Sequence, residues 1–101
     1  MNGSITVKGR TYPLHFTVNH ICRMEETLGE ALPKLMQGSL YGLRALLWCG
    51  LMGEGVELEA AGLLMESYLK EGGTLQSLSA TLASAMEDAG FFPSSARKQE
   101  A

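Results

Sequence analysis

SLYGLRALLWCGLMG, residues 39–53, is the stretch of this 101-residue chain that decides its fold, because it carries a single charge, on Arg44. Ser39 can cap the start of a helix, and the glycines at 53 and 55 can end one, so the stretch predicts a helix over about residues 39–53. A helix that is apolar nearly all round must be buried nearly all round. This helix is therefore expected at the centre of the fold, or partly covered by another subunit.

The three faces of this helix differ in character when its residues are read at helical spacing. One is a leucine stripe, which we expect to point into the core. The second is larger and partly aromatic, and we expect it to be shared between the core and a partner. The third is mostly small, so that another backbone can approach it closely. In this order the faces are Leu40, Leu43, Leu47 and Leu51; Tyr41, Ala45, Trp48 and Met52; and Gly42, Leu46, Cys49 and Gly53.

A β-hairpin is predicted ahead of this helix, over residues 4–16. Strand-like runs at residues 5–8 and 11–16 flank Gly9-Arg10, and a glycine in a two-residue connection fits a tight turn. An isolated hairpin is only marginally stable, so its apolar face must pack on helices. That face is expected to hold Ile5 and Val7, with Leu14 and Phe16 opposite them.

Further helices are predicted on both sides of the apolar one by caps, glycine stops and apolar residues at helical spacing. They cover about residues 18–28, 57–71 and 74–89, with a short helical turn over 31–37. Thr17 or Asn19 caps the first helix and Gly29 closes it, while Thr74 caps the last. The buried stripe expected on the first helix is Ile21, Met24 and Leu28, with Val18 and Cys22 beside it.

These elements amount to a single globular domain over residues 1–93, followed by a polar, flexible tail over 94–101. The fold class expected is α+β, mainly α, with the N-terminal hairpin packed on a bundle of about four short helices. Hydrophobic residues make up 46 % of the chain and charged ones 19 %, which is typical of a globular protein and not of a disordered one.

The charge pattern argues against nucleic acid as the partner, and the length of the apolar run argues against a membrane. The net charge is −3, and the basic residues are scattered singly except for Arg97-Lys98, so no basic stripe forms. The apolar run within residues 40–52 is too short to span a bilayer, which takes about 20 residues, and no secretory signal opens the chain. A cytoplasmic protein is expected, with Cys22 and Cys49 as reduced, small, buried side chains.

No arrangement in the sequence favours catalysis, a cofactor or a metal. A zinc site would have to use His20 and Cys22 with His15 and Cys49, but a His-x-Cys spacing sends the two side chains to different sides of a helix. The chain has a single aspartate, Asp88, and the glycines after the apolar helix form no phosphate-binding loop. We therefore expect a protein that is not an enzyme, with no catalytic residues, no cofactor and no metal site.

Four segments, in this order, resemble a family of small tail proteins, the tail assembly chaperones of long-tailed phages and of the related gene transfer agents. The segments are VKGRTYPLHFTVN (7–19), ICRMEETLG (21–29), LRALLWCGL (43–51) and LEAAG (58–62). Each is common by itself, and the ordered combination carries the resemblance, which covers roughly residues 5–69.

The resemblance implies a non-enzymatic role. Chaperones of this family bind the long, largely helical tape measure protein and keep it in solution until tail tube subunits polymerise around it. The partners implied are thus the tape measure protein and the tail tube protein, with self-association also expected from the surplus of apolar helix surface. The alternative function is a structural tail or head–tail component that remains in the virion.

The partner-binding residues expected from the sequence lie on the larger face of the apolar helix. They are Tyr41, Trp48 and Met52, with Arg44 at the rim to fix the orientation of the partner. For Trp48 the sequence leaves an alternative open, and slightly favours it: a lone tryptophan in a small domain usually anchors the core.

Overall fold

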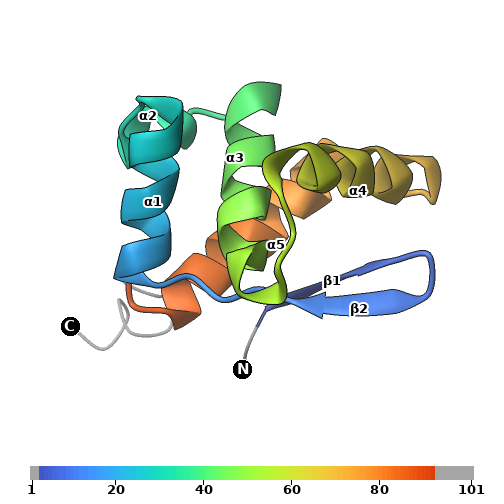
Figure 1. Cartoon of the computed structure of the whole chain (residues 1–101). Helices are drawn as coiled ribbons and strands as arrows, with labels where there is room; N and C mark the ends of the chain where they lie inside the picture. Colours follow the sequence, from blue (N-terminus) through green and yellow to red (C-terminus); the bar gives the residue numbers. More distant parts are fainter. Residues whose placement is uncertain (1–2, 93–101) are drawn as a thin grey trace.

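The computed structural model describes residues 3–92, in which a hairpin and several helices pack around a central helix, α3 (Figure 1). The strands are β1 (Ser4–Val7) and β2 (Arg10–Pro13). The helices are α1 (Val18–Leu28), α2 (Leu32–Leu35), α3 (Leu40–Leu51), α4 (Leu58–Lys70) and α5 (Leu75–Asp88), and a 3₁₀ turn, η1 (Met52–Glu54), follows α3. The predicted fold class, mainly α with an N-terminal hairpin, is confirmed. The tail predicted for residues 94–101 lies outside the described residues.

The helix starts follow from the caps that the sequence predicted. The Thr17 hydroxyl accepts a hydrogen bond from the His20 backbone N–H at 3.1 Å, and the Ser39 hydroxyl accepts one from the Gly42 N–H at 2.9 Å. Each bond satisfies a backbone donor that has no partner within its own helix. Gly29 closes α1 in the left-handed conformation, with φ of 69°. The predicted bounds of α1 are therefore confirmed at both ends.

The apolar helix is shorter than its predicted span of residues 39–53. Its α-helical part ends at Leu51, and the 3₁₀ turn η1 carries the chain on to Gly55. Gly55, with φ of 76°, takes the left-handed position that ends the segment, whereas Gly53 lies inside the turn. Of the two glycines that the sequence offered as stops, only Gly55 needs glycine's conformational freedom.

The hairpin turn lies at Lys8-Gly9, one residue earlier than the predicted Gly9-Arg10. Both turn residues have positive φ, 54° and 75°, as a two-residue turn of this twist requires. The Lys8 N–H is held by both carboxylate oxygens of Glu71, at 2.8 and 3.1 Å, which fixes the turn against the end of α4. Glycine is favoured as the second residue of such a turn, so the prediction that put Gly9 first in the turn is wrong.

The strand register follows from this turn and retains the predicted apolar face. Ile5 pairs with Tyr12 and Val7 with Arg10, so neither has Leu14 or Phe16 directly opposite it. Moving a turn by one residue shifts the partner strand by two, which keeps every side chain on its own face. Ile5, Val7, Leu14 and Phe16 are all buried, but the last two follow β2 as an extended segment in place of the predicted strand.

Helix α3 is central because elements lie against it on several sides. It contacts α1, α2, α4, α5 and β2, with α1 and α2 on one side and α4 and the hairpin on the other (Figure 1). The small face predicted for α3 is confirmed at Gly42, where an added Cβ would overlap the carbonyl oxygen of Leu35 in α2. The backbone of α2 therefore lies directly on α3.

The leucine stripe of α3 is buried except at its first member. Leu43, Leu47 and Leu51 are at most 5 % exposed, whereas Leu40 is 58 % exposed, so the prediction that Leu40 points into the core is wrong. The first turn of α3 projects beyond α4 (Figure 1). Leu40, the first residue of α3, lines an open groove between the two helices.

Two predictions on α1 are also wrong. Val18 is 66 % exposed and Cys22 is exposed, although both were expected beside the buried stripe. Helix α1 lies at the outside of the molecule, so only a narrow strip of its surface, at Ile21 and Met24, is fully buried. Leu28 is half-buried at the end of that strip.

Candidate functional site

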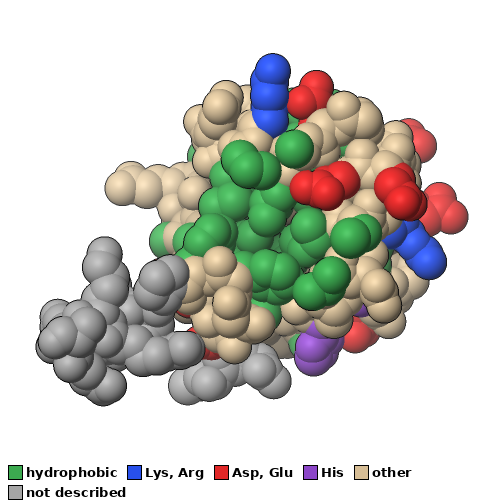
Figure 2. All heavy atoms as spheres, turned by 90° about the vertical axis from the view of Figure 1, so that its left-hand side faces the viewer, with side chains coloured by type: hydrophobic (Ala, Val, Ile, Leu, Met, Phe, Trp, Pro, Cys, Tyr) green, Lys and Arg blue, Asp and Glu red, His purple; other side chains and the backbone are tan. Residues whose placement is uncertain are grey.

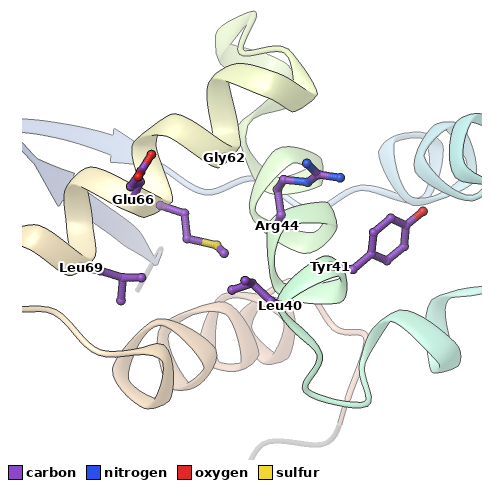
Figure 3. A pocket seen from close by; sticks show the side chains of 7 residues that line it. Leu40, Tyr41, Arg44, Gly62, Glu66 and Leu69 are labelled. Atoms are coloured by element: carbon purple, nitrogen blue, oxygen red, sulfur yellow. The ribbon is translucent and has the colours of Figure 1, made fainter.

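An open groove of about 490 Å³ lies between α3 and α4 (Figure 3). Leu40, Tyr41 and Arg44 come from α3, one helical turn apart or adjacent, and form one wall. The other wall comes from α4 at the same spacing. The α4 residues are Gly62, Met65, Glu66 and Leu69.

Apolar side chains dominate this α3–α4 groove and lie open to solvent. Leu40 is 58 % exposed and Tyr41 is 45 % exposed, while Leu69 is half-buried and Met65 is buried at the base. Large apolar side chains left exposed together are a feature of surfaces that another protein covers.

Gly62 leaves the room in which Arg44 lies. A Cβ added at Gly62 would lie 3.2 Å from Cδ of Arg44 and 3.8 Å from its Cγ. The apolar stem of Arg44 therefore passes directly over the α4 backbone. The bare glycine lets the side chain lie flat in the groove, with its methylene groups sheltered and its charged end free to reach the rim.

The Arg44 guanidinium is incompletely satisfied. Its Nε is buried and, among residues 3–92, has no hydrogen-bond partner. The guanidinium carbon lies 5.7 Å from the centroid of the Tyr41 ring, close enough for a cation–π attraction. That attraction is no substitute for an acceptor, because a buried N–H donor without a partner costs free energy.

The groove carries opposite charges on its two walls. Glu66 lies on the α4 wall, and the Arg44 guanidinium points away from it toward Tyr41 (Figure 3). A molecule lying in the groove therefore meets a cation near the start of α3 and an anion on α4.

Two of the four predicted partner-binding residues lie in the groove, and the other two lie in or against the hydrophobic core. Tyr41 and Arg44 line the groove together. Trp48 is only 9 % exposed and belongs to the hydrophobic core, in line with the alternative that it anchors packing. Met52 is half-buried in η1 and packs against the core, away from the groove.

The residues that the sequence did not identify lie mainly on α4. Met65 and Leu69 have the apolar spacing of core residues. Nothing in the neighbouring sequence distinguishes a residue that packs in the core from one that lines a groove. Gly62 was the available signal, because glycine in the middle of a helix is unfavourable and calls for a packing reason. Its partner across the groove is the one charged residue of the apolar helix.

A second apolar surface lies on the side of the molecule formed by α1 and α2. Figure 2 shows hydrophobic side chains gathered on that face, with carboxylates to one side of them. A smaller hollow, of about 120 Å³, lies between α2, α3 and α5 and includes the exposed Met36. Its lining carries no charge, so it offers little to orient a partner. The lining residues are Leu35, Met36, Gly38, Leu43, Leu46, Ser79, Leu82, Ala83 and Met86.

The nucleophiles and metal-ligating side chains do not converge in the described part of the chain. No group of three or more His, Cys, Asp or Glu side chains in residues 3–92 is arranged to hold a metal ion. Burial raises the pKa of the Cys49 thiol from its ordinary value of 9.0 to about 12, so this thiol stays protonated at neutral pH. Cys22 is exposed and lies outside the buried strip of α1.

Comparisons with protein-family models, with curated proteins and with solved structures found no match to this chain. None of the helices in residues 3–92 combines the length and the apolar character that crossing a bilayer demands.

Proposed function

We propose that this chain is a tail assembly chaperone of a long-tailed phage or prophage. In this role it binds helical segments of the tape measure protein in the host cytoplasm and helps the tail tube protein to polymerise. The resemblance of residues 5–69 to that family supplies the class of partner. The observation that carries the proposal is the open apolar groove between α3 and α4, whose leucine and tyrosine side chains are exposed.

The groove suits a helix as its occupant. Apolar grooves between helices commonly receive the apolar face of an amphipathic helix, read as residues at i, i+3, i+4 and i+7. A long tape measure helix offers many such faces in succession. Each contact would be weak because the groove is small, and many chaperone copies on one helix would together keep it in solution.

Co-expression tests this function. The chain is produced in a bacterial host with the tape measure protein encoded beside it, and the soluble fraction of the tape measure protein is measured with and without it. We expect the soluble fraction to rise and the two proteins to leave a gel-filtration column together.

No rise in solubility, together with separate elution of the two proteins, would contradict the chaperone role. Mass spectrometry of purified particles provides a second check. A chaperone is absent or scarce there, whereas the structural virion component would be present in amounts comparable to other tail proteins.

A further inference from the structure

We propose that the α3–α4 groove recognises an amphipathic helix through a carboxylate, which binds Arg44 at one end of an apolar stripe. The inference rests on the proposed function in taking the groove as a helix-binding surface, and it goes further by naming the chemistry that the bound segment must carry.

The first argument is the unsatisfied state of Arg44. Its Nε is buried without a partner in the described part of the chain, and its stem is held against Gly62. A carboxylate accepts hydrogen bonds from two guanidinium nitrogens at once, including Nε, and such charge-assisted pairs are the strong ones. Binding an Asp or Glu side chain would satisfy this donor once the Arg44 side chain turns to bring Nε to the surface of the groove.

The second argument is the orientation of the two charges. Arg44 lies on the α3 wall and points away from Glu66 on the α4 wall (Figure 3). A ligand carboxylate is attracted at the Arg44 end and repelled at the Glu66 end. This asymmetry sets the direction of the bound segment, which is the usual contribution of charges at an interface.

The third argument is the shape of the groove, which decides what kind of ligand brings the carboxylate. Leu40 and Tyr41 remain about half exposed, so the groove is open along its rim. A small carboxylic acid would be left largely in water, although small ligands normally bury most of their surface. A second copy of this chain would present the same concave surface, and two hollows do not fill each other. A helix is convex and fits.

A panel of synthetic helices tests this chemistry without the tape measure protein. Each 18-residue peptide carries leucines at i, i+3, i+4 and i+7 and one glutamate beside that stripe, at a different position in each peptide. Every peptide has a twin with glutamine in place of glutamate. Binding is measured by fluorescence anisotropy against the full chain and against Arg44→Gln, Arg44→Glu and Glu66→Gln, after circular dichroism has shown that each variant is folded.

We expect at least one glutamate peptide to bind the unaltered protein about tenfold more tightly than its glutamine twin, which corresponds to ~1.4 kcal/mol. Arg44→Gln should erase that difference, and Arg44→Glu should prefer a lysine version of the same peptide. Glu66→Gln, which removes a charge from the other wall, should keep the preference for glutamate.

Several results would overturn the inference. These are the absence of binding by every peptide, equal binding of all twins, or a glutamate preference that survives in Arg44→Gln. Tight binding of octanoate at Arg44 would mean a small-molecule site, and a dimer that Arg44→Gln dissociates would mean that a second copy occupies the groove.

The two proposals fail separately. Tape measure solubilisation that Arg44→Gln leaves unchanged removes this inference and leaves the chaperone role. A charge preference in the peptides without any effect on the tape measure protein removes the chaperone role and leaves the groove chemistry.

Discussion

Gly62 of α4 faces Arg44 of α3 so closely that a Cβ on residue 62 would lie 3.2 Å from Arg44 Cδ. Arg44 is the one charged residue of α3, and its side chain lies over the one position of α4 that has no side chain. Around this contact the exposed Leu40 and Tyr41 line one wall of an open groove.

Replacing Gly62 with alanine tests whether the room that glycine leaves for Arg44 outweighs the low helix propensity of glycine. We expect Gly62→Ala to raise the free energy of unfolding by about 0.5–1 kcal/mol, because alanine is the better helix former and the flexible Arg44 side chain can shift by the few tenths of an ångström required. Urea denaturation measures this change. A loss of stability would show instead that Arg44 is held rigidly against α4.

Gly42 provides a test of the close packing of α2 on α3. Gly42→Ala should destabilise the fold by at least ~2 kcal/mol, because its methyl group would overlap the Leu35 carbonyl and force the two helices apart. The matched control is Gly53→Ala, whose Cβ would meet only a His20 ring carbon at 3.7 Å. Similar urea midpoints for the two variants would contradict the packing described for α2.

Trp48 should act as a core residue. Trp48→Ala is expected to reduce the free energy of unfolding by roughly 3–5 kcal/mol, since the side chain is only 9 % exposed and leaves a cavity when removed. Thermal and urea unfolding both report the loss. A variant of native stability that only binds a partner less well would place Trp48 at the interface, the less favoured of the two roles that the sequence left open.

The two cysteines should differ sharply in reactivity. At pH 8 a thiol reagent should modify the exposed Cys22 readily and Cys49 only after unfolding, because Cys49 is fully buried and its thiol stays protonated. Counting modified thiols in native buffer and in guanidinium gives the result. Two fast-reacting thiols in native buffer would disagree with the burial of Cys49.

Cys49 also gives a pH dependence with a defined sign. Its pKa is about 12 in the folded chain against an ordinary value of 9.0, so the unfolded state loses the proton first. The contribution of Cys49 to stability is therefore complete below about pH 9 and declines as the pH rises toward 12. Cys49→Ala should show a weaker decline over this range in urea titrations, and equal slopes for the two proteins would refute the assignment.

The parts of the fold that the sequence predicted well depend on local interactions. Thr17 and Ser39 cap helices through hydrogen bonds that span three residues, and Gly29 closes a helix by its own backbone conformation. Such signals lie within a few residues, and the helix bounds followed from them. The hairpin turn was misplaced by one residue because a single glycine fits either position of a two-residue turn, and the observed turn puts Gly9 second and Lys8, with φ of 54°, first.

The candidate site could be predicted only in part for a related reason. Periodicity fails to orient a helix that is apolar on every face. Leu40 was therefore assigned to the core, and Trp48 was named among the partner-binding residues although the core was slightly favoured for it. Arg44 stood out because it is the single charge in its helix. Its position opposite Gly62 depends on how α3 and α4 pack, which neither helix encodes alone.

Matched leucine variants test the proposal that the α3–α4 groove binds the tape measure protein. Leu40 borders the groove and is 58 % exposed, and Leu63 is on α4 outside the groove and 61 % exposed, so either can be changed to glutamate with little cost to the fold. The measurement is the amount of tape measure protein that co-purifies with each variant. We predict that Leu40→Glu loses most of it and that Leu63→Glu keeps it. Equal recovery with both variants would contradict the proposal.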